Sequence, residues 1–377
     1  MTKDKQHINV PHLRFPEFTG EWKKVLLGQI ANITKGNGIS KEQLSDQGTP
    51  CILYGELYTK YKSEIINEIY SKTTLNSSAL VKSQANDVII PCSGETAIDI
   101  STARCVPYND VLLGGDLNII RLKSQNGGFF AYQLNGVRKH DIACIAQGVS
   151  VVHLYGENLK RIKVCYPSIE EQRKITSLLS LIDERIATQN KIIKKLETLI
   201  KALSHKLTTQ KKPNTLLKNC LVCHSSTLLE SHVKGKGQYP VFGATGICGY
   251  TDKSDISGDS ILIIKDGAGV GTTTYATGKY SVIGTLNYLQ STQEHYSLLY
   301  IYYSLKTFDF RPYITGMAIP HIYFRDYGKA KIWCPDIVEQ KRIATVLRTM
   351  DAKLKINHSI LRNLTLQKQY LLSNLFI

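Results

Sequence analysis

The stretch Pro167-Ser-Ile-Glu-Glu-Gln172 occurs a second time as Pro335-Asp-Ile-Val-Glu-Gln340, at an offset of 335 − 167 = 168 residues. The same offset relates Gly148-Val-Ser-Val-Val-His153 to Gly316-Met-Ala-Ile-Pro-His321 without a gap. Similarity at one fixed spacing indicates that a structural unit is repeated within the chain. We therefore expect two copies of one fold, each ending in the segment that begins at Pro167 or Pro335.

Both repeated segments carry the signals that begin a helix. Ser168 and Asp336 are N-cap residue types, and Glu171 and Glu339 follow three residues later. This spacing is the capping box, in which two side chains satisfy backbone N–H groups that the first helical turn leaves unpaired. The sequence predicts that a helix starts at each of these sites, directly after a proline that ends the incoming strand.

Behind each cap, apolar residues recur alternately every four and three residues, which is the 3.5-residue period of a coiled coil. A polar residue, Gln189 or Asn357, interrupts both stripes at the same step. Because a buried amide at such a position can fix register, we interpret the helices as paired rather than as two independent amphipathic helices. The second stripe continues through Lys368. The residues assigned to the coiled coil are Ile175, Leu179, Ile182, Ile186, Gln189, Ile193 and Leu196, with Ile343, Leu347, Met350, Leu354, Asn357, Leu361 and Leu364.

The remainder of each copy is rich in β-type segments, such as Val88-Ile-Ile90 and Ser260-Ile-Leu-Ile-Ile264. Such short runs of branched residues between turn signals favour strands. We predict an α+β chain with a pseudo-two-fold repeat. Its parts are a first globular domain over residues 1–166, a helix over 167–209, a second globular domain over 210–334 and a helix over 335–377.

The chain is strongly basic, with 47 Lys and Arg against 31 Asp and Glu in 377 residues and a formal net charge of +16. A charge of this size favours a polyanionic partner, and nucleic acid is the leading candidate.

No apolar run approaches the roughly 18 to 20 residues of a membrane span. The polar first ten residues lack a secretory core, and nine cysteines without framework spacing fit reduced thiols. We expect a cytoplasmic protein.

Motifs that would carry catalysis are weak or absent. Cys220-Leu-Val-Cys223-His224 lacks the second ligand pair of a zinc site. Asp266-Gly-Ala-Gly-Val-Gly271 departs from nucleotide-binding loops, and its glycines are better suited to close approach of a DNA backbone or to a tight turn. The acidic residues after Pro335 are explained by helix capping rather than by nuclease chemistry. We predict no catalytic and no metal-binding residues.

The chain resembles the specificity (S) subunit of type I restriction-modification enzymes over nearly all of its length. The resemblance is carried by the opening Pro11-His-Leu-Arg-Phe-Pro-Glu-Phe18, by Ser93-Gly-Glu-Thr96, by Gly114-Gly-Asp-Leu-Asn-Ile-Ile-Arg121 and by the two Pro-x-Ile-x-Glu-Gln helix starts. The duplicated helix start is the most specific of these motifs. The second globule is shorter and matches less well, as a variable target-recognition domain would.

The resemblance implies that each globule is a target-recognition domain that reads one half of a split DNA site. It implies two antiparallel helices that act as a spacer and whose exposed parts dock the methyltransferase subunits. A helix of 38 residues is roughly 57 Å long, which suits half-sites about one duplex turn apart. Two methyltransferase subunits and two motor-nuclease subunits would join the chain. S-adenosylmethionine, ATP and Mg would then bind those partners, and this chain would need no cofactor.

Lysine and arginine side chains on the globules are the candidates for DNA contact, because phosphates dominate affinity and attract cations. The candidates are Lys35, Lys60, Lys62 and Arg104 in the first globule, and Lys234, Lys236, Lys253, Lys265 and Lys279 in the second. Gly267 and Gly269 are added as loop residues whose backbone a DNA strand could approach closely. A single-chain DNA methyltransferase or nuclease is the alternative, although its cofactor loop or metal carboxylates are missing. A coiled-coil protein without DNA binding is a third interpretation, but it leaves the charge and the duplicated globules unexplained.

Overall fold

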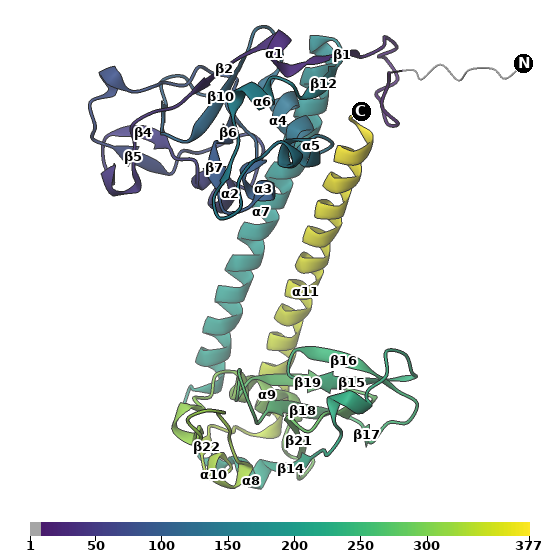
Figure 1. The fold of residues 1–377 in the computed structure, drawn as a ribbon. Coiled ribbons are helices and arrows are strands. Elements are labelled where there is room, and N and C mark those ends of the chain that lie inside the picture. The colour runs from purple at the N-terminus through teal and green to yellow at the C-terminus, as the bar shows by residue number, and fades with distance from the viewer. Residues whose placement is uncertain (1–8) are drawn as a thin grey trace, which may run out of the picture. The chain divides into compact units, whose positions relative to one another are not determined.

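The computed structural model describes residues 9–377. The chain divides into two compact units, residues 1–190 with 360–377 and residues 191–359, which we call unit 1 and unit 2 (Figure 1). Each unit holds one β-rich globule together with a portion of both long helices. The helices are therefore shared between the compact units instead of forming separate domains of their own.

The two long helices are α7, Ile169–Thr208, and α11, Ile337–Asn374. Their cap bonds are present, since the Glu171 N–H donates to Ser168 Oγ at 3.4 Å and the Glu339 N–H donates to Asp336 Oδ1 at 3.0 Å. The prediction that the Glu171 side chain accepts a hydrogen bond from the backbone N–H of the N-cap residue is wrong. The Glu171 carboxylate instead accepts two bonds of 2.7 Å from Arg14, because a charged fork competes better than a neutral backbone N–H.

Unit 1 contains two four-stranded sheets. The first is antiparallel, in the order β2-β10-β6-β8, and the second, in the order β3-β5-β4-β9, includes a parallel β4–β9 pair. Helix α4, Gly127–Asn135, contacts β6 and β8 of the first sheet. The strands of these sheets are β2 (Ala31–Lys35), β10 (Leu117–Leu122), β6 (Asp87–Pro91), β8 (Arg104–Val106), β3 (Leu44–Ser45), β5 (Ser71–Thr73), β4 (Thr49–Ile52) and β9 (Leu112–Leu113).

Unit 2 repeats the topology of the first sheet and keeps a second four-stranded sheet with a different strand order. Its first sheet has the order β14-β21-β18-β19, and its second, β16-β15-β20-β17, again contains one parallel pair, β15–β20. Helix α9, Leu298–Lys306, contacts β18 and β19, as α4 contacts β6 and β8. The predicted duplication of the globule is confirmed. The strands are β14 (Leu221–Ser225), β21 (Leu286–Ser291), β18 (Ser260–Ile264), β19 (Thr273–Ala276), β16 (Gly246–Thr251), β15 (Tyr239–Gly243), β20 (Lys279–Val282) and β17 (Ile256–Ser257).

Shorter elements complete each unit. Two-stranded pairs β1–β12 and β11–β7 lie in unit 1, and β13–β22 lies in unit 2. The short strands are β1 (Lys23–Leu26), β7 (Ser93–Gly94), β11 (Val152–His153), β12 (Lys163–Tyr166), β13 (Thr215–Leu216) and β22 (Lys331–Ile332). The short helices are α1 (Leu27–Ile30), α2 (Glu56–Thr59), α3 (Ala97–Ile100), α5 (Lys139–Cys144), α6 (Gly156–Leu159), α8 (Leu217–Cys220) and α10 (Phe324–Tyr327).

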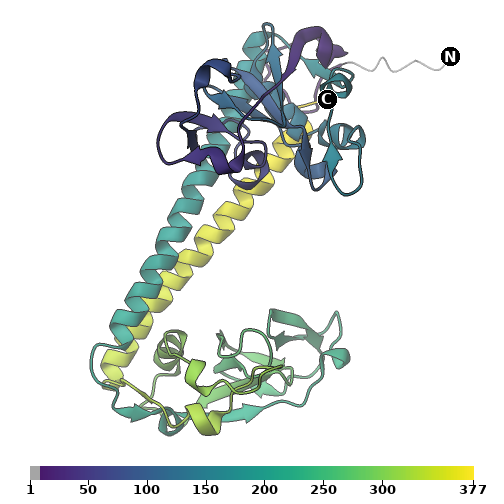
Figure 2. The same ribbon diagram turned by 60° about the vertical axis from the view of Figure 1, so that its left-hand side comes forward.

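The main core of each unit joins the globule to both long helices. In unit 1 it combines Phe129 of α4 with Leu179 of α7 and Leu371 of α11. In unit 2 it combines Tyr300 of α9 with Leu347 of α11, and Leu203 of α7 packs against it. Because the start of α7 meets the end of α11 in unit 1 and the reverse holds in unit 2, the helices run in opposite directions (Figure 2).

The residues assigned to the coiled coil all lie on the inner side of their helices. Ile175, Leu179, Ile182, Gln189, Ile193, Ile343 and Leu347 are buried, and the other seven are half-buried. The flanking Leu181, by contrast, is 55% exposed. A stripe of this kind along both helices is the surface that paired helices bury. No helix in residues 9–377 is long and apolar enough to cross a membrane.

Candidate nucleic-acid interface

Four of the lysines predicted to contact DNA gather around one sheet of unit 2. Lys253 follows β16 and Lys279 opens β20 of the sheet β16-β15-β20-β17. The segment that carries Lys234 and Lys236 pairs with the edge of β16 through a bridge between Lys234 and Tyr250. All four side chains are exposed, and one of them, Lys234, lies 3.4 Å from the Asp252 carboxylate in an ion pair open to solvent. Together they give this sheet a cationic border of the kind that phosphates attract.

The glycine-rich loop of unit 2 presents bare backbone. Gly267 and Gly269 have φ values of 90° and 85°, and no atom lies within 4 Å of the site where a Cβ on Gly267 would be. Glycine accepts this left-handed conformation without strain, so the residue type follows from the backbone. Lys265 is only 24% exposed and lies 3.9 Å from Asp266, which makes it a weaker phosphate ligand than the lysines on the sheet.

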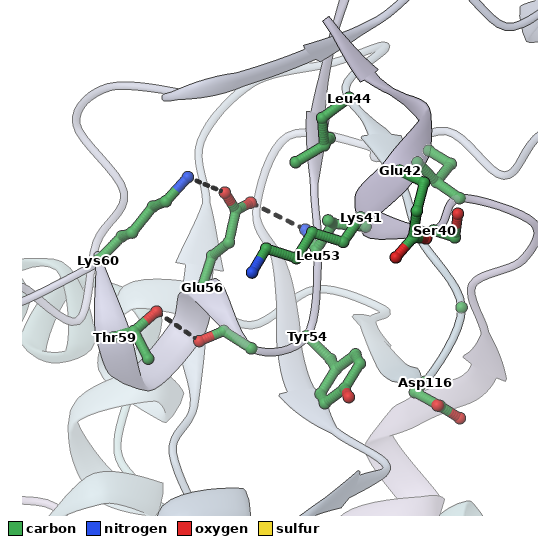
Figure 3. Close-up of a pocket in the computed structure, with 13 residues that line it drawn as sticks. Ser40, Lys41, Glu42, Leu44, Leu53, Tyr54, Glu56, Thr59, Lys60 and Asp116 are labelled. Carbon is green, nitrogen blue, oxygen red and sulfur yellow. Dashed lines mark hydrogen bonds and ion pairs between the residues drawn. The ribbon is translucent and has the colours of Figure 1, made fainter.

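In unit 1 the candidate lysines are dispersed. Lys35 ends β2 and is exposed, whereas Lys60 and Lys62 follow α2. The Lys60 ammonium lies 2.6 Å from the Glu56 carboxylate, on the wall of a cavity of about 580 Å³ (Figure 3). The cavity is lined by Lys41 and Lys60 but also by Glu42, Glu56 and Asp116. This balance of charge does not favour a phosphate.

Arg104 does not belong to the candidate interface. It lies on β8 and is 7% exposed, and its guanidinium donates hydrogen bonds to the carbonyl oxygens of Leu57 at 3.1 Å and Tyr61 at 2.8 Å. Burial lowers the pKa of Arg104, while the nearby Glu64 opposes that shift. The prediction that Arg104 contacts DNA is corrected, because its donors serve the backbone inside unit 1.

The glutamine of each repeated helix start holds a globule to its long helix. Gln172 accepts from the Asn126 N–H at 3.0 Å and donates to the Pro167 carbonyl at 3.0 Å. In unit 2, Gln340 accepts from the Ser297 N–H at 2.9 Å and donates to the Pro335 carbonyl at 2.8 Å. Asn126 and Ser297 are the N-caps of α4 and α9. One side chain thus fixes the angle between two helices in each copy.

A tyrosine–aspartate bond joins the same two helices deeper in each core. Tyr132 donates to Asp183 at 2.8 Å in unit 1, and Tyr303 donates to Asp351 at 2.9 Å in unit 2. The repeat already pairs Asp183 with Asp351 at the offset of 168. That regularity was a signal in the sequence for a structural role, but the tyrosine partners emerge from the fold.

Unit 1 adds a buried lysine to this bond. Lys368 of α11 lies 2.5 Å from both Glu64 and Asp183, and the three side chains are 14%, 8% and 6% exposed. Burial and the neighbouring Glu64 raise the pKa of Asp183 to about 6, against the opposing charge of Lys368. The network ties the last turns of α11 to the globule and to α7.

This raised pKa predicts how the stability of unit 1 depends on pH. The folded state holds a proton on Asp183 more tightly than the unfolded chain does, so this contribution is present below about pH 4 and lost as the pH rises through about 6. Two pKa units correspond to up to about 3 kcal/mol. The pKa of the neighbouring Glu64 is lowered, because the Lys368 charge outweighs its burial, and this shift acts on stability in the opposite sense. The contribution of Asp183 is therefore the difference between the wild type and Asp183→Asn in urea unfolding between pH 4 and 7. An equally steep decline in Asp183→Asn would contradict the assignment.

Comparison with known proteins agrees with the geometry. The model of the type I restriction modification DNA specificity domain matches residues 19–198 and again residues 222–366. The chain belongs to this family. The two matches correspond to the two copies, and each spans a globule and most of the long helix that follows it.

Solved structures share the fold of this specificity chain. The crystal structure of a type I restriction-modification system S subunit from M. genitalium matches with a TM-score of 0.72 and 18% identity, over 98% of this chain and 99% of that one. A structure described under complex assembly and conformational transition of the type I R-M system matches with a TM-score of 0.55 and 16% identity, over 94% and 97% of the two chains. At such identities the likeness concerns the fold.

A metal-dependent catalytic site would need several ligating side chains close together. Across residues 9–377, no three His, Cys, Asp or Glu side chains are grouped so that they could hold a metal ion. The motif from Cys220 to His224 runs from α8 into β14, with Cys220 buried and His224 stacked on Tyr288 at 4.8 Å. The imidazole therefore has an ordinary packing role.

Proposed function

We propose that this chain is the DNA-reading subunit of a type I restriction-modification complex and that each unit reads one half of a bipartite site. The observation that carries the proposal is the duplicated globule, each copy followed by a long helix and each matched by the DNA specificity domain. A second unit of the same fold but different surface residues suits a second, different half-site.

We infer that the chain has no catalytic role of its own and acts inside a larger assembly in the cytoplasm. Methyltransferase subunits, one for each unit, would transfer methyl groups from S-adenosylmethionine to adenine, and two motor-nuclease subunits would use ATP and Mg. The charge of +16 supports DNA as the shared partner. A single-chain methyltransferase or nuclease is disfavoured by the lack of a cofactor loop in the sequence.

The direct test is to co-express the chain with the methyltransferase subunit of the same restriction-modification system and to sequence the host genome for N6-methyladenine. We expect one split motif with two short defined halves and a gap of constant length. Methylation that follows a continuous motif, or that is unchanged when this chain is omitted, would refute the proposal. A catalytically inactive methyltransferase variant provides the background.

The cationic border of unit 2 should contribute affinity without reading sequence. Replacing Lys234, Lys236 and Lys253 by Gln should weaken DNA binding and reduce the slope of log K against log salt by about 0.9 for each lost phosphate contact, while the methylated motif stays the same. Fluorescence anisotropy at several salt concentrations measures the slope. Lys218→Gln on α8 is the matched control, and an equal effect of this control would argue against a localised border.

Helix length should set the gap between the half-sites. Inserting one heptad into each helix, after Asn190 and after Ser359, keeps the apolar seam in phase because the insertion equals the repeat. Seven residues add about 10.5 Å, or about three base pairs. The methylated motif should therefore keep both halves and gain about three base pairs of gap. An unchanged gap in an assembled, active complex would show that the helices are not the spacer.

A further inference from the structure

Each globule contains a hairpin that is closed in the same way. In unit 1, Gln147 and His153 exchange backbone hydrogen bonds of 2.9 and 2.7 Å, and in unit 2 Thr315 and His321 do so at 2.9 and 2.8 Å. We call residues 147–153 hairpin 1 and residues 315–321 hairpin 2. They correspond at the offset of 168 that relates the two helix starts.

Both hairpins expose apolar side chains at the same two positions. Val149 and Val151 of hairpin 1 are 97% and 53% exposed, and Met317 and Ile319 of hairpin 2 are 106% and 65% exposed. Scattered apolar residues on a surface need no explanation. Two adjacent ones, repeated at equivalent places of a duplicated fold, indicate a surface that is covered in the working protein.

The backbone holds these side chains in a preformed shape. Gly148 and Gly316 have φ values of 118° and 87°, and a Cβ on either would lie 2.1 or 2.3 Å from the carbonyl oxygen three residues later. Each stem is also anchored, since Leu154 N–H donates to the Cys92 carbonyl at 2.7 Å and Ile322 N–H to the Lys265 carbonyl at 3.0 Å. A rigid tip loses little conformational entropy when it binds.

The two tips carry no charged side chain of their own, although hairpin 2 lies against the glycine-rich loop, whose Gly267 N–H donates to the Pro320 carbonyl at 2.9 Å. Residues 145–155 and 313–323 contain no Lys, Arg, Asp or Glu, in a chain whose net charge is +16. The stem of hairpin 1 pairs with β7 and contacts α3, next to the carboxylates of Glu95 and Asp99. Lysine and arginine, which dominate affinity for phosphates, are absent from both tips. The exposed apolar side chains of these tips suit an apolar pocket on a protein partner.

The duplication narrows the choice of partner. The two units would read different half-sites, so the surfaces that meet bases should differ between them, whereas these hairpins agree in backbone, in closure and in exposed apolar positions. We propose that the two hairpin tips are docking knobs for the methyltransferase subunit, which meets each unit once. This inference rests on the proposed function and adds to it a contact surface on each globule.

The test uses the full chain and the purified methyltransferase subunit of the same system. One variant carries Val149→Ser with Val151→Ser, a second carries Met317→Ser with Ile319→Ser, and a third carries all four changes. Native mass spectrometry and sedimentation measure how many methyltransferase subunits bind. We expect each two-site variant to bind one of its two methyltransferase subunits about tenfold or more weakly, and the four-site variant to bind both weakly.

Two controls make the result specific. Leu229→Ser changes another apolar residue, which is 58% exposed in unit 2, and it should assemble like the wild type. Thermal unfolding of every variant should match that of the wild type, because the changed side chains touch solvent. DNA binding by the variants without methyltransferase should also be unchanged.

Three results would overturn the inference. If the four-site variant assembles with wild-type affinity, the tips are not docking knobs. If it assembles normally but binds DNA more weakly, the tips contact DNA instead. A wild-type chain that neither binds the methyltransferase nor directs methylation to a split motif would refute the proposed function itself, and the inference with it.

Discussion

Replacing Lys368 by Ala should destabilise unit 1 by about 3–5 kcal/mol at neutral pH, because removal of one partner leaves buried charges uncompensated. In the wild type, the Lys368 ammonium is shared by Glu64 and Asp183, 2.5 Å from each. Without it, two carboxylates would face each other in a site that is almost closed to water. The loss should shrink below pH 6, where a raised pKa lets Asp183 take up a proton.

The two tryptophans allow this loss to be assigned to one unit. Trp22 is buried in unit 1 and Trp333 in unit 2. Urea unfolding followed by fluorescence in a Trp333→Phe background reports unit 1, and a Trp22→Phe background reports unit 2. Lys368→Ala should shift the unit 1 transition.

Unit 2 supplies a matched control for the buried lysine. Lys306 lies 3.6 Å from Asp351, which is the counterpart of Asp183, but it is 35% exposed. Lys306→Ala should therefore cost less than about 1 kcal/mol. Equal losses for the two lysines would show that burial does not govern the effect. The double variant Lys368→Met, Asp183→Asn should recover much of the stability, since the remaining Glu64 carboxylate keeps the buried Arg104 guanidinium as its cationic neighbour.

Replacing Leu179 or Leu347 by Ala should cost about 2–5 kcal/mol each, because each change leaves a cavity in a packed core. Both leucines are 0% exposed, and they are equivalent residues of the duplicated stripe. Leu179 belongs to the core of unit 1 and Leu347 to that of unit 2. Leu179→Ala should shift the transition seen by Trp22, and Leu347→Ala the transition seen by Trp333.

Neighbouring exposed residues serve as controls for these truncations. Leu181 is 55% exposed and Val346 is 45% exposed. Leu181→Ala and Val346→Ala should change stability by no more than about 0.5 kcal/mol, as surface substitutions do. If Leu179→Ala and Leu181→Ala cost the same, the assignment of the apolar stripe to the inner face of α7 would be wrong.

Features that depend on neighbours along the chain were predictable. The offset of 168, the cap residues Ser168 and Asp336, and the 3.5-residue stripe specified two copies and two long helices. They did so because capping and amphipathic periodicity act over three to seven residues, within the reach of a local pattern. The glycines of the loop at Gly267 likewise indicated a backbone conformation with positive φ, which only glycine adopts easily.

The tertiary structure alone decided which charged residues are buried and which pairs meet. Arg104 is of a residue type that is usually exposed, yet its guanidinium serves backbone carbonyls inside unit 1. Lys368 falls in the predicted stripe, but its partners Glu64 and Asp183 emerge only from the fold. Glu171 has the spacing of a capping box but binds Arg14, 157 residues away. The sequence determined the repeat, the helices and the family resemblance, since these rest on local order and repetition. Which partner a charged side chain meets depends on segments that folding brings together, and a local sequence pattern does not specify those segments.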